Sequence, residues 1–292
     1  MTGAGVVPSV DAGLRIVDAH VHFYADDLPG ARSAAPYGLP DLHAEVAAAG
    51  AVLAGCVHVE AGRGPRWSMA ESTRWQGLSD SSGVPTVLVA AVELQQPALA
   101  DALDAQQQIP SVVGVRQMLD WHGDVKTASP LLSDPHWRRG LAALSERRLT
   151  FDLQVLPEQL ADAAELTRAF PDVQFVLNHG GLHVPWAQAD LRQWSDDLRL
   201  LGSCPNVAVK TSGFDTVDHR WDGRRVRNYL AVLLERFGPA RTLFASNFPI
   251  DRAGIGYGPL LEHHLVALGG LDGAERDLVL RRNACRIYRI EE

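Results

Sequence analysis

The stretch RIVDAHVH, residues 15–22, begins with an apolar run and ends in two histidines separated by one residue. Its branched apolar residues favour a β-strand, in which the two-residue side-chain period places His20 and His22 on one face. Neighbouring imidazoles at the carboxyl end of a buried strand pack poorly but suit a metal ion or a polarised substrate. The alternative is a pair of core histidines bonded to backbone carbonyls. Asp18, on the same face, either orients an imidazole or pairs with a buried arginine.

Seven further β-like stretches follow, with amphipathic stretches between them. The starts of the eight strands are spaced by roughly 23 to 39 residues, the length of a βα unit. This repetition predicts a single (β/α)8 barrel over residues 15–292, after a flexible lead-in at 1–14. The strand stretches are RIVDAHVH from Arg15, AGCVHVE from Ala54, PTVLVAAVEL from Pro85, SVVGVRQML from Ser111, LTFDLQV from Leu149, DVQFVLNHG from Asp172, NVAVKTSG from Asn206 and RTLFASN from Arg241.

Local signals mark the ends of the expected helices. The amphipathic stretch from Leu39 ends at Gly50, where a glycine can take a positive φ after the last turn. The stretch from Ser133 begins with a capping-type serine, and the stretch from Pro157 has proline in its first turn. We expect these stretches to connect successive parallel strands.

Composition excludes several functional classes. The 292 residues carry a net charge of −8, which argues against a nucleic-acid or anionic-membrane surface. No apolar run reaches the ~18 to 20 residues needed to span a bilayer, and the first residues lack the features of a secretory signal. Three widely spaced cysteines fit reduced thiols better than a disulfide framework. We therefore expect a cytoplasmic protein without nucleic-acid or membrane partners; it can be monomeric or a homo-oligomer.

Chemically capable side chains gather at the carboxyl ends of six of the eight predicted strands. Active sites of (β/α)8 barrels form at that end, and the amino ends show no comparable enrichment. These side chains are His20 and His22, His58 and Glu60, Arg116, Asn178 and His179, Lys210 with Thr211 and Ser212, and Ser246 with Asn247.

The ordered motifs DAHVHFY, NHGG and LFASNFP resemble the amidohydrolase superfamily, of the amidohydrolase-2 type. HVEA at His58, GVRQML at Gly114, FDLQVLPEQL at Phe151 and VAVKTSGF at Val207 are similar to its lactonase-rich branch, which includes 2-pyrone-4,6-dicarboxylate lactonase and L-fuconolactonase. The resemblance covers nearly the whole chain. It implies a distorted (β/α)8 barrel of the metal-dependent-hydrolase type. It also implies hydrolysis at a carbonyl or phosphorus centre, often in small sugar-acid or carboxylate-bearing lactones.

The resemblance also assigns residues. The family's histidines on strands one and six are matched here by His20, His22 and His179, and the resemblance implies that these residues are catalytic. In some members the same histidines bind one zinc-like ion, and other members use no metal. For this chain, a bound metal and a metal-independent site both remain open. Arg116 resembles a residue that binds a substrate carboxylate, which implies a small, anionic substrate. Most of the superfamily has aspartate as general base where this chain has Asn247, and an amide neither takes a proton at neutral pH nor binds metal well. The usual base is therefore absent or has moved.

Three further residues are candidates for substrate binding. His58 could instead replace the missing base, together with Glu60, or line the pocket without chemistry. His122 follows strand four and is a contact or an ordinary loop histidine. Asp251 lies four residues after Asn247 and is either a relocated base or a surface or capping carboxylate.

The two cations at the strand ends have structural alternatives. Arg116 could form an ion pair with Glu93 or Asp152 instead of clamping a substrate carboxylate. Lys210 could balance anionic charge or pair with a carboxylate.

These residues predict a hydrolase of a small, carboxylate-bearing lactone or related ester or amide, attacked by water at the barrel mouth. The strand-one histidines, or a metal that they hold, would stabilise the oxyanion, and a metal or His179 would activate the water. One alternative is a decarboxylase of the same superfamily. Another is a catalytically degenerate barrel that binds small acids, because Asn247 replaces the usual aspartate.

Overall fold

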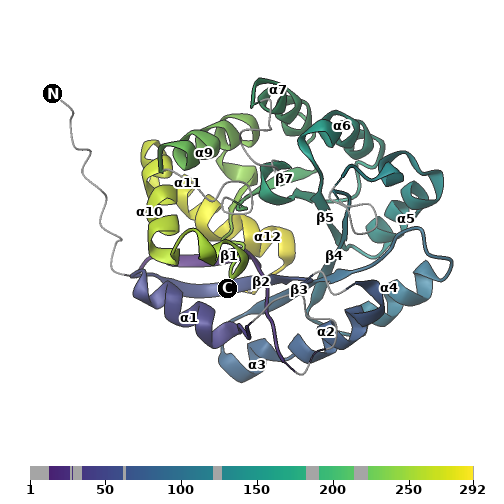
Figure 1. Cartoon of the computed structure of the whole chain (residues 1–292), viewed down its shortest axis with the longest axis horizontal. Coiled ribbons are helices and arrows are strands. Elements are labelled where there is room, and N and C mark those ends of the chain that lie inside the picture. The colour runs from purple at the N-terminus through teal and green to yellow at the C-terminus, as the bar shows by residue number, and fades with distance from the viewer. Residues whose placement is uncertain are drawn as a thin grey trace.

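The computed structural model describes residues 13–26, 28, 35–61, 64–120, 127–181, 191–213 and 223–291. Eight parallel strands in the order β1 to β8 form one sheet, which curls into a barrel (Figure 1). Each strand overlaps one of the eight predicted stretches, so the predicted (β/α)8 barrel is confirmed. The strands are β1 (Arg15–Val21), β2 (Val52–Val59), β3 (Thr86–Ala91), β4 (Val112–Met118), β5 (Thr150–Gln154), β6 (Phe175–Leu177), β7 (Val207–Thr211) and β8 (Thr242–Phe244).

The barrel closes between β1 and the segment that follows β8. Asn247 N donates to His20 O at 2.8 Å, and His22 N donates to Phe248 O at 2.8 Å. Val21 and Phe248 form a single parallel bridge in place of a longer ladder. This short, irregular seam is the distortion of the barrel, and it joins the carboxyl ends of the two strands.

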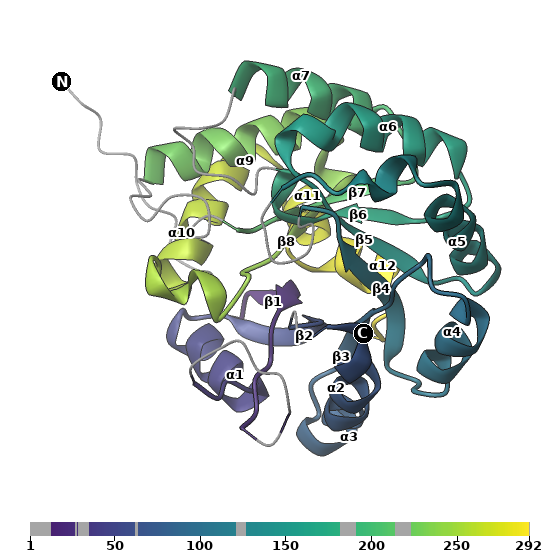
Figure 2. The same cartoon turned by 45° about the vertical axis from the view of Figure 1, so that its right-hand side comes forward.

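Helices surround the strands on the outside of the barrel (Figure 2). Among the residues that the structure describes, no helix has both the length and the hydropathy needed to cross a bilayer. The helices are α1 (Leu39–Ala48), α2 (Ser68–Trp75), α3 (Leu78–Ser82), α4 (Leu99–Gln107), α5 (Pro135–Glu146), α6 (Leu160–Ala169), α7 (Leu191–Gly202), α9 (Gly223–Phe237), α10 (Tyr257–Ala267), α11 (Gly273–Asp277) and α12 (Asn283–Tyr288).

Of the predicted helix ends, the one at Gly50 agrees with the structure and the one at Ser133 does not, while Pro157 begins a 3₁₀ turn (Pro157–Gln159) that leads into α6. Gly50 follows α1 with φ +79°, as expected for a glycine beyond the last turn. The residue that caps α5 is Asp134, whose Oδ1 accepts the backbone N–H of His136 at 2.7 Å. Ser133 was therefore the wrong capping residue by one position, because Pro135 begins the helix and the side chain just before it reaches the free N–H groups.

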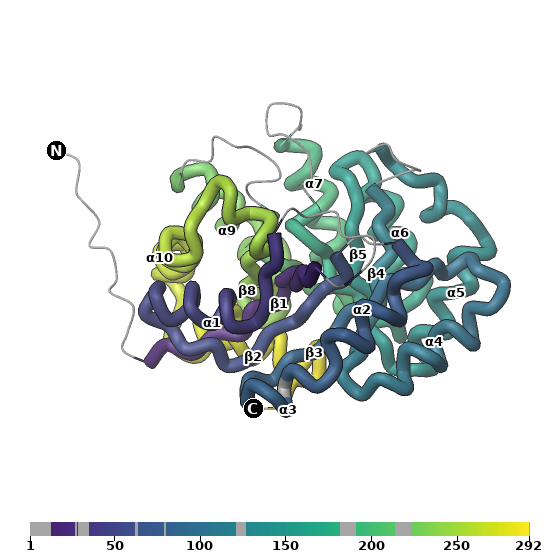
Figure 3. Tube along the Cα trace, turned by 60° about the horizontal axis from the view of Figure 1, so that its bottom comes forward, coloured from purple at the N-terminus to yellow at the C-terminus, as the bar shows by residue number. Residues whose placement is uncertain are grey.

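Alternation along the strands divides the core into two layers, one inside the barrel and one beneath the helices. The inner layer includes Val59, Val176 and Tyr288, the last of which comes from α12. The chain end that follows α12 lines the same surface cleft as α3, a cleft of about 640 Å³ with Glu291, Asp80 and Ser111 in its walls. Figure 3 shows α3 and the chain end on one side of the barrel. Ser111 directly precedes β4, so α12 and this cleft lie at the amino end of the barrel. The polar residues predicted for the site follow the strands at the opposite, carboxyl end of the barrel.

Candidate active site

Three of the predicted site imidazoles lie together at the carboxyl end of the barrel. Nε2 of His20 is 3.1 Å from Nε2 of His22, and the ring centroids of His20 and His179 are 4.7 Å apart. All three side chains are buried. Because β1 and β6 are not neighbours in the sheet, only the closure of the barrel brings these rings together.

Hydrogen bonds determine where the protons of the His20–His22 pair lie. Nδ1 of His22 is 2.8 Å from the carbonyl oxygen of Val59, and a carbonyl only accepts, so Nδ1 carries the proton. Nε2 of His22 then holds a lone pair, and in the contact between the rings His20 Nε2 must donate. Burial holds the pKa of both imidazoles well below the usual range, and the nearby charges of Lys210 and Arg116 act in the same direction. Burial therefore favours the neutral form of both rings.

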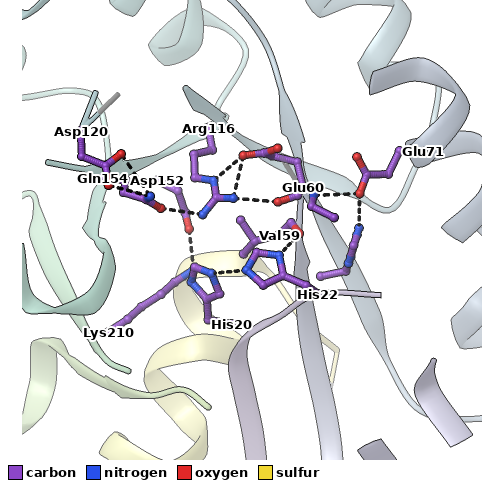
Figure 4. A network of polar contacts seen from close by, with 12 residues as sticks. His20, His22, Val59, Glu60, Glu71, Arg116, Asp120, Asp152, Gln154 and Lys210 are labelled. Carbon is purple, nitrogen blue, oxygen red and sulfur yellow. Dashed lines mark hydrogen bonds and ion pairs between the residues drawn. The ribbon is translucent and has the colours of Figure 1, made fainter. Parts of the chain in front are cut away.

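A buried ion pair lies behind His20 (Figure 4). Lys210 Nζ pairs with Asp152 and lies 3.5 Å from Nδ1 of His20. The hydroxyl of Tyr288 donates a hydrogen bond to Asp152 Oδ1 at 2.7 Å, which holds the carboxylate from the amino end of the barrel. Burial lowers the pKa of Lys210 to about 8, although Asp152 opposes this shift. Of the two predicted alternatives for Lys210, pairing with a carboxylate is observed.

Arg116 is bound on two sides by protein groups. Its Nε donates to Glu60 Oε1 at 2.7 Å, and Nη2 donates to Glu60 O at 2.7 Å. Nη1 donates to Gln154 Oε1 at 2.8 Å. The predicted ion pairs with Glu93 or Asp152 are wrong, because Glu60 reaches the guanidinium from the end of β2 (Figure 4). A substrate carboxylate would have to compete with a paired, buried charge.

His58 uses both ring nitrogens for protein contacts. Nδ1 accepts the backbone N–H of Phe23 at 3.0 Å, so Nε2 carries the proton and donates to Glu71 Oε1 at 3.1 Å. The ring also stacks on Phe23, with centroids 5.2 Å apart. His58 therefore fixes the segment after β1 against α2, and these contacts do not support the predicted contact with substrate.

Asn247 and Asp251 form one unit. Asn247 Nδ2 donates to Asp251 Oδ1 at 3.0 Å, and Gly213 N donates to Asp251 Oδ2 at 3.0 Å. Asp251 is fully buried, so the alternative of a surface carboxylate is wrong. Asn247 has φ +60° and His179 has φ +53°, a backbone region that is strained for residues other than glycine and concentrates at functional sites.

His179 is held by residues that follow β7. Its Nδ1 lies 2.9 Å from Ser212 Oγ. Gly213 has φ +85°, and a Cβ there would lie 2.7 Å from the Cβ of His179. Gly213 thus contacts both His179 and, through its N–H, Asp251. In the sequence, the Ser-Gly pair at the end of the seventh strand is the signal for this contact, but the pattern does not indicate a role for the glycine.

Asn178 carries a buried side chain with unmet hydrogen-bonding capacity. Its exposed fraction is 1%, and neither Nδ2 nor Oδ1 has a partner within the described part of the chain. Asn178 directly follows β6, whose Val176 belongs to the inner layer, so its amide lies at the carboxyl end of that strand. An unmet buried amide costs about 1–3 kcal/mol, so such a group is normally satisfied by water or ligand. The sequence placed Asn178 at a strand end but gave it no function.

Asp18 links β1 to the segment after β8. Oδ1 accepts the N–H of Ser246 at 2.9 Å, and Oδ2 accepts the hydroxyl of Tyr257 at 2.9 Å. Oδ1 also accepts the backbone N–H of His20 at 3.2 Å. Burial raises the pKa of Asp18 to about 6 despite these donors. Neither predicted contact, with an imidazole or with an arginine, is among these bonds; the carboxylate fixes the backbone of His20.

The residues present do not complete a metal site. An ion about 2.05 Å from Nε2 of both His20 and His22 would have an N–ion–N angle of about 98°, which is acceptable for zinc. However, in the parts of the chain described, no three His, Cys, Asp or Glu side chains are arranged to hold a metal. The predicted set of His20, His22 and His179 is therefore not formed as a ligand set. Asn247 stands where a carboxylate ligand is expected, and Lys210 adds positive charge.

The remaining candidate, His122, lies outside the described residues.

Comparison with known proteins identifies the family. An amidohydrolase family model matches residues 17–290. The chain belongs to the amidohydrolase family. This amidohydrolase is 34% identical over 243 residues to uncharacterized protein y4mH of Sinorhizobium fredii, which covers 82% of this chain and 81% of the relative. It is 29% identical over 303 residues to L-fucono-1,5-lactonase of Burkholderia multivorans, covering 94% and 96% of the two chains.

A crystal structure of an amidohydrolase from Burkholderia multivorans, with bound zinc, has the same fold. Its TM-score is 0.81 at 25% identity, and the match covers 94% of this amidohydrolase and 99% of that chain. The predicted resemblance to this family is thus confirmed.

Proposed function

We propose that this amidohydrolase hydrolyses small, neutral lactones that carry hydroxyl groups, with sugar-acid lactones such as L-fucono-1,5-lactone as the first candidates. The observation that carries the proposal is the convergence of His20, His22 and His179 at the carboxyl end of the barrel. Membership of the family and the 29% identical L-fucono-1,5-lactonase support it.

The pairing of Arg116 favours a neutral lactone over a carboxylate-bearing one. Glu60 neutralises the guanidinium at an Nη2–Oε1 distance of 2.6 Å, with both side chains buried. A substrate carboxylate near this pair would meet Glu60 as well as Arg116. Asn178 instead offers a donor and an acceptor together, and a substrate hydroxyl satisfies both.

The proposed chemistry uses the imidazoles directly. The lactone carbonyl oxygen replaces His22 as the acceptor of the hydrogen bond that His20 Nε2–H donates. This hydrogen bond stabilises the oxyanion that forms when water attacks. His179, oriented by Ser212, takes a proton from the attacking water, and when the ring C–O bond breaks it returns this proton to the departing alkoxide, which gives the hydroxy acid. Asp251 lies across Gly213 from His179 and supplies negative charge that stabilises the resulting imidazolium.

Hydrolysis of a lactone panel by the purified protein tests this function. Proton release is followed with a pH indicator on L-fucono-1,5-lactone, on unsubstituted δ-valerolactone and on 2-pyrone-4,6-dicarboxylate. We expect turnover to be fastest on the hydroxylated lactone. We expect His179→Asn to lower kcat by about 10²- to 10⁴-fold, because it removes a general base.

His43→Asn is the matched control, since His43 is exposed on α1 and should leave kcat unchanged. Tight lactone binding without turnover by the wild type would contradict the proposal and favour a degenerate binding barrel. A wild-type rate in His179→Asn would remove His179 from the mechanism.

A further inference from the structure

The polar groups around His20 form a line in which each proton position follows from its neighbour (Figure 4). At one end, the Val59 carbonyl requires the proton of His22 to be on Nδ1. His22 therefore presents a lone pair at Nε2, and a hydrogen bond across the 3.1 Å between the two Nε2 atoms is donated by His20. A neutral imidazole has one proton, so Nδ1 of His20 is an acceptor.

The other end of the line gives the same answer independently. An ammonium group donates and never accepts, and Lys210 Nζ lies 3.5 Å from Nδ1 of His20. Lys210 cannot turn away easily, because it is fully buried and paired with Asp152, which Tyr288 holds in turn. Two separate contacts thus favour one tautomer of His20, opposite to that of His22.

This arrangement is incompatible with chelation by the two rings. A metal ion needs a lone pair on Nε2 of each histidine, and here Nε2 of His20 carries the proton. To bind metal, His20 would have to move that proton to Nδ1, where it would face the ammonium of Lys210.

We propose that Lys210 is a positioning residue that holds His20 as the Nε2–H tautomer, so that the strand-one pair donates to a substrate oxygen instead of binding a metal ion. Only the kinetic value of that donor rests on the proposed function. The tautomer and the metal affinity are properties of the protein without substrate, so their test is separate from any failure to hydrolyse lactones.

Long-range ¹⁵N–¹H correlation spectra of protein labelled at histidine measure the tautomers directly. In the wild type we expect a protonated Nε2 and a bare Nδ1 at His20, and the reverse at His22. A proton on Nδ1 of His20 in the wild type would overturn the proposal, and this measurement needs no folded variant.

The variant Lys210→Met/Asp152→Asn removes the cation together with its counter-ion, so no unpaired charge is left in the core. We expect the ¹⁵N signals of His20 to change in this variant and to stay as in the wild type in Lys210→Arg, which keeps a donor. His58 is the internal control, because Phe23 and Glu71 hold its tautomer independently. Unchanged His20 signals in the double variant would contradict the role of Lys210.

Zinc titration of the same proteins gives a second readout. We expect the double variant to bind zinc about 10- to 100-fold more tightly than the wild type, the range found when partners of a ligating histidine change. Adding His20→Gln should abolish that gain. Equal zinc affinity in the wild type and the double variant would overturn the proposal.

Discussion

The Asn178→Leu variant is expected to be more thermally stable than the wild type, although most core substitutions destabilise a protein. Leucine has nearly the shape of asparagine and removes two polar atoms that lack partners within the described part of the chain. Each unmet buried group costs about 1–3 kcal/mol, and a bound water recovers part of that cost. A net gain of about 1–3 kcal/mol is therefore a reasonable expectation for the variant.

The size of the shift in Tm follows from the length of the chain. At about 2.1 cal/mol/K per residue, 292 residues give an unfolding entropy of about 0.6 kcal/mol/K. A gain of about 1–3 kcal/mol then raises Tm by about 2–5 °C, which differential scanning calorimetry measures easily.

Asn206→Leu is the matched control, because it makes the same chemical change at an amide whose bonds are met. Asn206 Nδ2 lies 3.0 Å from the carbonyl oxygens of both Thr167 and Phe170. We expect this variant to lose about 1–3 kcal/mol, since it leaves partly buried carbonyls without a donor. If Asn178→Leu lowers Tm as Asn206→Leu does, Asn178 has a structural partner, and the reasoning that assigns it to a ligand is refuted.

Two further predictions concern charge. Asp251→Asn should lower kcat by at least about 10²-fold. Adding Asn247→Asp to this variant should restore part of kcat, because it returns a carboxylate to the end of β8. If the second change does not restore activity, the carboxylate is required at position 251 itself. Burial lowers the pKa of His264 to about 4, so between about pH 4 and 6.5 the unfolded chain binds a proton that the native protein does not. Stability should therefore fall as pH drops from 6.5 to 4, and denaturant melts of His264→Gln should show a shallower fall. An equal slope of stability against pH in the wild type and in His264→Gln would show that His264 is not the group responsible.

The barrel and the three imidazoles could be predicted because they depend on local pattern. A strand's two-residue period places His20 and His22 on one face wherever the strand lies. Parallel strands in a closed barrel present their carboxyl ends at one rim, which brings His179 to the same place.

The partners of the charged residues could not be predicted, because they depend on distances across the barrel. Glu60 and Asp152 were both within reach of Arg116 by strand order, and only the structure shows that Asp152 pairs with Lys210. Tyr288 is far from the site in sequence and reaches Asp152 only because α12 closes the amino end of the barrel.

The role of His58 was hidden for a similar reason. Its i, i+2 relation to Glu60 resembled that of the strand-one pair. The contacts that occupy its nitrogens come from Phe23 and from Glu71 on α2, and no local pattern in the chain indicates them.

Turnover of L-fucono-1,5-lactone by protein treated with a chelator and dialysed into metal-free buffer tests the central claim most directly. Because His20 stabilises the oxyanion and His179 transfers the proton, we expect kcat to be retained without metal and not to be raised by added zinc. Loss of turnover on chelation, with recovery on adding zinc, would contradict it.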